Sequence, residues 1–123
     1  MISYDDFSKV EIKAGKIISA EKIPDTDKLL KLMVDFAESK ETIDEAGNKV
    51  IMPYTRQIVS GISMYFPDTS ELIGKVCMFV TNLEPRMIKG YESNGMLFAL
   101  STPQGQFSLL VPEKDIPIGI KAK

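Results

Sequence analysis

The apolar positions of the chain fall into short runs separated by turn-forming residues, which is the pattern expected of strands. Residues 10–18 alternate apolar and polar side chains in their first half, which predicts a strand, and Gly15 then interrupts the pattern as glycines do at bulges. The turn residues 24–27 close this strand. Residues 29–36 form an apolar run whose shortness, directly after a turn, favours a second strand over a helix.

The rest of the chain continues in the same way, with one long polar interruption. Residues 37–55 are polar and charged, and Ala46-Gly47-Asn48 indicates a turn between two extended arms, so we expect a solvated loop or a protruding hairpin. The dipeptide Asn94-Gly95 is a further hairpin-turn signal. The remaining strands are predicted over residues 57–62, 75–80, 95–100 and 106–111, the last two joined by a hairpin-type connection at 102–105.

Helical signals are few and short. Ser3 and Asp6 have the spacing of a capping box, which predicts one helical turn near the N-terminus. Residues 67–74 predict a short helix that ends at a glycine, and the two prolines of the tail 112–123 exclude a long helix there. Short strands, turn signals and one small helix predict a mainly β fold, most simply a five-stranded OB-fold barrel with a C-terminal extension.

The length of the chain limits the number of cores that it can form. A chain of 123 residues buries roughly two-thirds of its unfolded surface, so residues 1–123 are expected to form one domain. No apolar run approaches about 18 residues and the N-terminus is acidic, so we expect no membrane segment and a cytoplasmic protein. The single cysteine, Cys77, lies in an apolar run and is expected to be buried.

Several classes of enzyme lack their usual residues in this sequence. The chain has no histidine and no Cys-x-x-Cys pair, which argues against a catalytic zinc site and removes the commonest general base. Neither of the common glycine-rich phosphate-binding motifs is present. The neighbouring carboxylates Asp25 and Asp27 are better explained as turn residues than as an acid and base pair. We therefore expect no catalytic residues, no metal and no cofactor.

The segment from Asn82 to Met96 carries the most informative chemistry. It places Arg86, Lys89 and three small polar residues in a turn-rich connection between two apolar runs, and such connections carry function more often than strands do. Arginine and lysine pair with phosphate oxygens, while Asn82 and Ser93 can hydrogen-bond to a base or to a ribose hydroxyl. Within the chain alone, the same two residues could instead cap turns of the loop.

Further cations and aromatic residues extend this candidate surface. Each lysine alone would be an ordinary surface residue. The presence of Arg86 and Lys89 supports three further candidates for phosphate contacts: Lys28, Lys31 and Arg56. Tyr91 and Phe98 are candidates for stacking on an unpaired base, and Phe98 is better explained as a core residue.

The order of the motifs resembles the tRNA-binding domain of methionyl-tRNA synthetases, their detached beta subunits and stand-alone bacterial tRNA-binding proteins. The resemblance rests on segments that cover almost the whole chain: Asp6-Phe7, Lys9-Val10, Gly15-Lys16-Ile17, 27–32, Val34-Asp35, 56–62, the loop ending in Ser93-Asn94-Gly95-Met96, and 110–119. It implies an OB-fold homodimer, paired through the N-terminal turn and the residues 112–123, that binds tRNA and can associate with an aminoacyl-tRNA synthetase. The implied tRNA-binding residues are Lys28, Lys31, Arg56, Ser60, Asn82, Arg86, Lys89, Ser93 and Met96.

Two features reduce the positive charge expected of a nucleic-acid binder. The net charge is −2, and the acidic stretch 38–50 leaves 13 acids and 13 bases in the rest of the chain. Glu84 and Met87 also stand where related domains usually have cations. The sequence therefore predicts modest, salt-sensitive tRNA binding through local clusters. The alternatives are a peptide-binding module similar to the export chaperone of the same fold, and a purely structural dimerisation domain.

Overall fold

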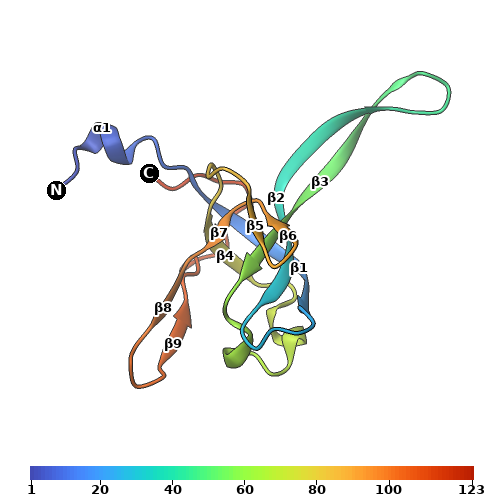
Figure 1. Cartoon of the computed structure of the whole chain (residues 1–123). Helices are drawn as coiled ribbons and strands as arrows, with labels where there is room; N and C mark the ends of the chain where they lie inside the picture. Colours follow the sequence, from blue (N-terminus) through green and yellow to red (C-terminus); the bar gives the residue numbers. More distant parts are fainter.

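The computed structural model describes all residues from 1 to 123 and shows a mainly β architecture (Figure 1). Its centre is an antiparallel five-stranded sheet in the order β3-β2-β1-β4-β7, which curls into a half-barrel of OB type. The predicted fold class is therefore confirmed. The strands are β1 (Ile12–Lys22), β2 (Leu30–Ile43), β3 (Lys49–Ser60), β4 (Val76–Val80) and β7 (Met96–Leu97).

Hydrogen bonds between the two edges of this sheet close the curl. The amide of Asn94, just before β7, donates to the carbonyl of Gln57 in β3 at 2.8 Å. The amide of Val59 donates to the Ser93 hydroxyl at 3.0 Å. Because these bonds pair edge groups that would otherwise be open, the segment before β7 is held against β3. The loop that precedes β7 is thereby fixed to the rim of the half-barrel.

The core lies inside the curl and explains Gly15. Phe36 packs edge-on against Phe79, with ring centroids 5.2 Å apart. A Cβ atom at Gly15 would lie 2.7 Å from Val34 Cγ1 and would collide with the Phe36 ring. The prediction of a bulge at Gly15 was wrong, since Gly15 pairs regularly with Cys77 and the register shift of β1 lies between Ile17 and Ser19. Position 15 requires glycine because the Phe36 side chain lies directly against the backbone of β1 there.

The polar segment 37–55 forms a hairpin that projects from the barrel, as predicted. Strands β2 and β3 continue their pairing from Glu38↔Tyr54 to Ile43↔Lys49, and the turn is closed by a bond from the Asp44 amide to the Asn48 carbonyl. The arm extends into solvent away from the rest of the chain (Figure 1). Its residues beyond Glu38 are almost all exposed.

Smaller elements complete the chain. The predicted capping box is present at the one short helix, α1 (Tyr4–Phe7), where the Asp6 amide donates to the Ser3 hydroxyl at 3.0 Å. The second predicted helix is a 3₁₀ turn, η2 (Thr69–Leu72), and a similar turn, η1 (Ser63–Tyr65), precedes it. The predicted run 95–100 is divided between β7 and β8 (Ala99–Ser101), and β8 pairs with β9 (Phe107–Leu109) in a separate hairpin.

The C-terminal extension packs along the first half of β1. The amide of Ala14 donates to the Ile120 carbonyl at 3.1 Å, and the amide of Ala122 donates to the Ile12 carbonyl at 2.7 Å. The tail thus occupies the side of β1 that β2 leaves free, because the pairing with β2 starts only at Lys16. The two chain ends lie on the same side of the molecule (Figure 1). No helix has the length and apolar character needed to span a membrane.

Candidate functional site

The loop between β4 and β7 contains a hairpin that the sequence pattern did not reveal. Strand β5 (Arg86–Ile88) pairs with β6 (Tyr91–Ser93), and the pairing runs from Arg86↔Ser93 to Ile88↔Tyr91. The turn is Lys89-Gly90, with φ of 50° and 85°, as a two-residue hairpin turn requires. The turn signal at Asn94-Gly95 was misleading, since Gly95 instead passes within reach of Ile58, where a Cβ atom would lie 2.9 Å from Cδ1.

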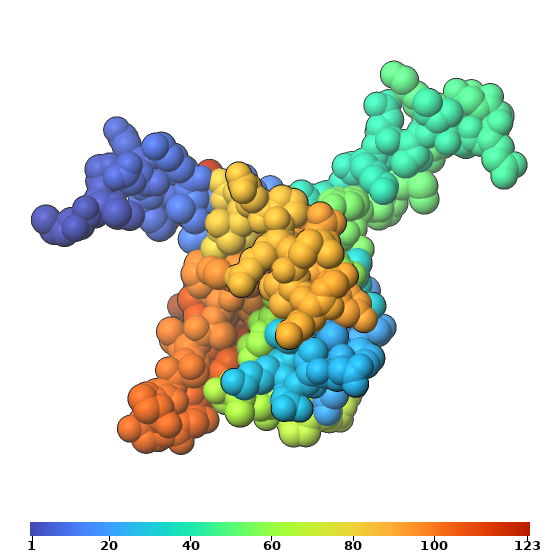
Figure 2. Space-filling model, viewed as in Figure 1, coloured from blue at the N-terminus to red at the C-terminus, as the bar shows by residue number.

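Three of the predicted cations are free of intramolecular ion pairs. The four ion pairs of the structure use Lys13, Lys31, Lys49 and Arg56. Arg86, Lys89 and Lys28 are exposed and take no part in them. Figure 2 shows the β5–β6 hairpin beside the segment that contains Lys28 on one face of the molecule. These side chains can therefore approach a polyanion without first breaking a contact within the protein.

Lys31 connects this segment to the hairpin. Its ammonium group lies 5.9 Å from the centre of the Tyr91 ring and 3.4 Å from a carboxylate oxygen of Glu21, which is itself largely exposed. Such an exposed ion pair contributes only about 0–1 kcal/mol, so a phosphate can replace the carboxylate at little cost. The ring of Tyr91 is half-buried, which leaves one part of it at the surface.

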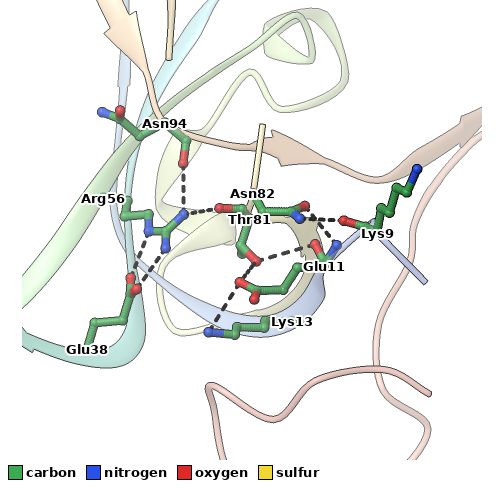
Figure 3. Close-up of polar contacts among 8 residues, drawn as sticks. All are labelled: Lys9, Glu11, Lys13, Glu38, Arg56, Thr81, Asn82 and Asn94. Carbon is green, nitrogen blue, oxygen red and sulfur yellow. Dashed lines mark hydrogen bonds and ion pairs between the residues drawn. The ribbon is translucent and has the colours of Figure 1, made fainter. Parts of the chain in front are cut away.

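Arg56 is engaged by other groups of the same chain. Its guanidinium binds both carboxylate oxygens of Glu38 at 2.7 Å, and it also donates to the backbone carbonyls of Thr81 and Asn94 (Figure 3). Only 16% of its side chain is exposed, and it lies 5.4 Å from the Phe36 ring centre. The hydrogen bonds with Glu38 raise the pKa of Arg56. Within the chain, Arg56 clamps the base of the projecting hairpin to the Asn82 loop, and its contact with phosphate stays a prediction.

Asn82 is also engaged within the chain. Its amide oxygen accepts from the Glu11 amide at 2.7 Å, and its amide nitrogen donates to the Lys9 carbonyl at 2.6 Å (Figure 3). Beside it, the Thr81 hydroxyl donates to the Glu11 carboxylate at 2.6 Å, which lowers the pKa of Glu11. Both ends of the Asn82 amide thus hold the N-terminal segment, and its contact with a base or a ribose stays a prediction.

Ser93 is buried and has its hydroxyl satisfied. It accepts from the Val59 amide at 3.0 Å and donates to the Gly95 carbonyl at 3.1 Å. These two bonds are the turn-capping role, and a direct contact of Ser93 with RNA stays a prediction. Met96, by contrast, is 45% exposed at the start of β7, and Ser60 is half-buried at the end of β3 opposite Leu30.

Sequence reasoning overlooked Glu38, the residue that determines what Arg56 does. The two residues are 18 positions apart and meet only because β2 and β3 pair across a register shift between Asp35 and Glu38. No local motif signals this contact. The only indication of this contact in the sequence was that Glu38 is charged and lies near the start of a long polar segment.

The structure contains no cluster of three or more side chains suited to hold a metal ion. Cys77 is fully buried in the core, and this burial raises the pKa of its thiol to about 11. A nucleophilic cysteine needs exposure and a lowered pKa, and Cys77 has neither. What the site offers is free cations, exposed apolar side chains and a fixed loop, which suits binding.

Comparison with known proteins agrees with this description. Residues 12–121 match the family model described as "Putative tRNA binding domain". The chain is 46% identical over 124 residues to a methionine–tRNA ligase from Methanoregula boonei, covering all of this chain and 16% of the relative. The curated relatives are thus about six times longer than the region that they share with this chain.

Solved structures give the same grouping. A protein from Pyrococcus horikoshii, described as related to methionyl-tRNA synthetase, superposes with a TM-score of 0.79 at 35% identity, covering 100% of this chain and 98% of that one. The CsaA chaperone from Picrophilus torridus superposes with a TM-score of 0.75 at 28% identity over the whole of both chains.

Proposed function

The chain belongs to the tRNA-binding domain family, and from this premise we propose that it binds tRNA through the β5–β6 hairpin and the adjoining Lys28 segment without catalysing a reaction. The observation that carries the proposal is that Arg86, Lys89 and Lys28 are exposed and outside every ion pair, in segments that lie side by side on one face (Figure 2). An unpaired guanidinium offers a planar fork to phosphate oxygens, and each lysine adds a mobile point charge.

The binding residues of the proposal form a smaller set than the sequence predicted. Arg86, Lys89, Lys28 and Lys31 contact phosphates, Met96 lines the same cavity as Arg86, and Ser60 is opposite Leu30, next to Lys31 in the chain. Arg56, Asn82 and Ser93 act through the loop that they hold in place. A rigid loop reduces the conformational entropy that is lost on binding, so these three residues favour affinity without touching RNA.

The assembly proposed is a homodimer joined through the chain ends. Tyr4 and Phe7 of α1 are 81% and 46% exposed, and Ile120 of the adjoining tail is 46% exposed, although all three are apolar or aromatic. An open cavity of about 460 Å³ lies between α1 and the tail, lined in part by Tyr4, Phe7 and Lys121. A second copy that covered this surface would remove it from water.

A deletion of residues 1–8 tests the dimer. We expect the shortened chain to sediment as a monomer while its barrel stays folded, because the deleted residues are exposed. Sedimentation velocity and circular dichroism measure the two properties. A dimer that survives the deletion would place the interface elsewhere.

Two partners follow from the proposal. tRNA is a cytoplasmic ligand, so the protein acts in the cytoplasm, and an aminoacyl-tRNA synthetase is the enzyme to which a tRNA would be delivered. Two copies of a weak site on one dimer would bind one tRNA more tightly than a single copy.

Binding of unfolded peptide is a second candidate function. Leu83, Met87 and Met96 are 51%, 65% and 45% exposed around Arg86, and methionine side chains adapt to varied apolar partners. The similarity to a CsaA chaperone supports this alternative.

A direct competition distinguishes the two functions. Fluorescence anisotropy would be used to measure binding to labelled, unfractionated tRNA in low salt, with an unfolded reduced protein or double-stranded DNA as competitor. We expect micromolar tRNA binding that neither competitor removes at equal concentration. Displacement by the unfolded protein, or absence of tRNA binding, would favour the peptide-binding function.

A further inference from the structure

A small cavity lies beside the β5–β6 hairpin, and the proposed phosphate contacts do not use it. Its volume is about 180 Å³. Buried Val59 and Ser93 contribute to it, as do the more exposed Leu83 and Met96. The complete lining is Val59, Leu83, Glu84, Arg86, Ile88, Ser93, Gly95 and Met96.

The lining of this cavity is held in a fixed arrangement. The Ser93 hydroxyl bridges the Val59 amide and the Gly95 carbonyl at 3.0 and 3.1 Å. Gly95 is packed so closely against Ile58 and the Val80 carbonyl that a side chain would not fit. The cavity therefore has a largely pre-formed shape, as is usual for sites that recognise a small planar group.

Two opposite charges line the cavity without neutralising each other. Glu84 and Arg86 are both exposed, and neither takes part in any of the four ion pairs of the structure. A carboxylate in a loop that binds phosphate is unfavourable by itself. An ionised carboxylate only accepts hydrogen bonds. On the cavity wall, Glu84 can therefore bind a group that donates hydrogen bonds instead of a phosphate.

We propose that this cavity binds one unpaired guanine base of the RNA, an inference that rests on the proposed tRNA-binding function. The side chains of Leu83 and Met96 contact the faces of the base, and the Glu84 carboxylate accepts hydrogen bonds from its N1–H and N2–H groups. Arg86 binds a phosphate next to that nucleotide. Unpaired bases that leave the stack are the parts of RNA that proteins read by sequence.

Guanine is selected because its pairing edge matches a carboxylate. The N1–H and N2–H groups are neighbouring donors that face the same way, so both carboxylate oxygens are satisfied. Adenine and cytosine present one amino group beside a ring nitrogen whose lone pair repels a carboxylate. Uracil presents one N–H group between two carbonyl oxygens, and these oxygens also repel the carboxylate.

The test uses single-stranded RNA probes of about ten nucleotides, within the usual range for one OB fold. Each probe is an oligouridine with one central guanosine, adenosine, cytidine or inosine, and anisotropy gives its Kd. We expect the guanosine probe to bind about tenfold more tightly than the other three. Inosine lacks the N2 amino group, so it is the most stringent of these comparisons.

Glu84→Gln is the matching protein variant, because it keeps the shape of residue 84 but removes one of the two acceptors. We expect it to lose the preference for guanosine, because its NH2 group donates where guanine also donates, whereas adenosine and cytidine offer a donor beside an acceptor and fit the carboxamide at least as well. Glu92→Gln is the control, since Glu92 is an exposed acid on β6 that does not line the cavity. It should retain the tenfold preference for guanosine.

The possible outcomes separate this inference from the function on which it rests. Equal binding of the four probes by the natural protein, together with salt-sensitive tRNA binding, would overturn the guanine site and leave the function standing. Absence of any RNA binding at low salt would overturn both. A guanosine preference that persists in Glu84→Gln would show that another group reads the base.

Discussion

The two arginines of the chain show how much the role of a residue depends on its surroundings. Arg56 is mostly buried, is bound by Glu38 through both carboxylate oxygens, and donates to two backbone carbonyls. Arg86 is exposed and outside every ion pair. Sequence alone could not separate them, because both lie in family motifs and the partner of Arg56 is distant along the chain. The structure engages Arg56 within the chain and leaves Arg86 free, in agreement with the binding role proposed for Arg86.

We expect Arg56→Ala to reduce the free energy of unfolding by about 2 kcal/mol. This lies between the small value of an exposed ion pair and the 3–5 kcal/mol of a fully buried one, since Glu38 would lose its partner while 24% of its side chain is exposed. Urea denaturation measures the change, and Arg86→Ala, expected within about 0.5 kcal/mol of the natural protein, is the control. An unchanged stability in Arg56→Ala would contradict the clamp.

Cys77 allows a second test at this scale. With its thiol pKa raised to about 11, only about one molecule in a thousand carries the thiolate at pH 8, and the side chain is buried in addition. We expect a thiol-specific chromogenic reagent to react with the folded protein at least a hundredfold more slowly than with the protein in urea. Rapid reaction of the folded protein would mean that the core opens easily at β4.

At the scale of elements, the sequence pattern predicted the strands that carry a run of buried apolar side chains and failed for β5 and β6, which carry none. The run 29–36 was recognisable because Leu30, Leu32, Val34 and Phe36 all point into the core. Strands β5 and β6 are three residues each, and their one buried side chain is the polar Ser93, so no alternation of apolar and polar residues marked them. Their turn also uses Lys89 at a positive φ, a conformation that lysine rarely adopts.

The projecting hairpin is expected to be independent of the binding surface. Asp44 lies six residues beyond Glu38, and six strand residues span about 20 Å, well beyond the screening length of about 8 Å at physiological salt. Replacing residues 41–51 by an Asn-Gly turn should therefore change the tRNA affinity less than twofold and leave the unfolding temperature nearly unchanged. Anisotropy and thermal denaturation measure these quantities.

A different result would be equally informative about the arm. A clear gain in affinity would place its acidic tip near the RNA, since the replacement removes Glu41, Asp44 and Glu45 together with Lys49. A loss of affinity would make the arm part of the binding surface.

At the scale of the whole molecule, charge is distributed so that a net negative chain can still bind a polyanion. The net charge is −2, yet the acidic arm projects away, while the β5–β6 hairpin and the segment that contains Lys28 lie side by side on one face. The barrel was predictable because its core residues alternate along the strands. The composition of the site was only partly predictable, because Asn82 and Ser93 turn their polar atoms inward to bonds that depend on the folded chain.

The most direct test of the account is the salt dependence of tRNA binding. The natural protein would be compared with the double variant Arg86→Ala, Lys28→Ala and with a control, Lys40→Ala, Lys49→Ala, that removes two exposed cations from the arm. About six phosphate contacts predict a slope of log K against log salt of roughly −4 to −5. We expect the first variant to reduce this slope by about two for each protomer in contact, and the control to keep it. Equal slopes in all three proteins, or no binding at low salt, would contradict it.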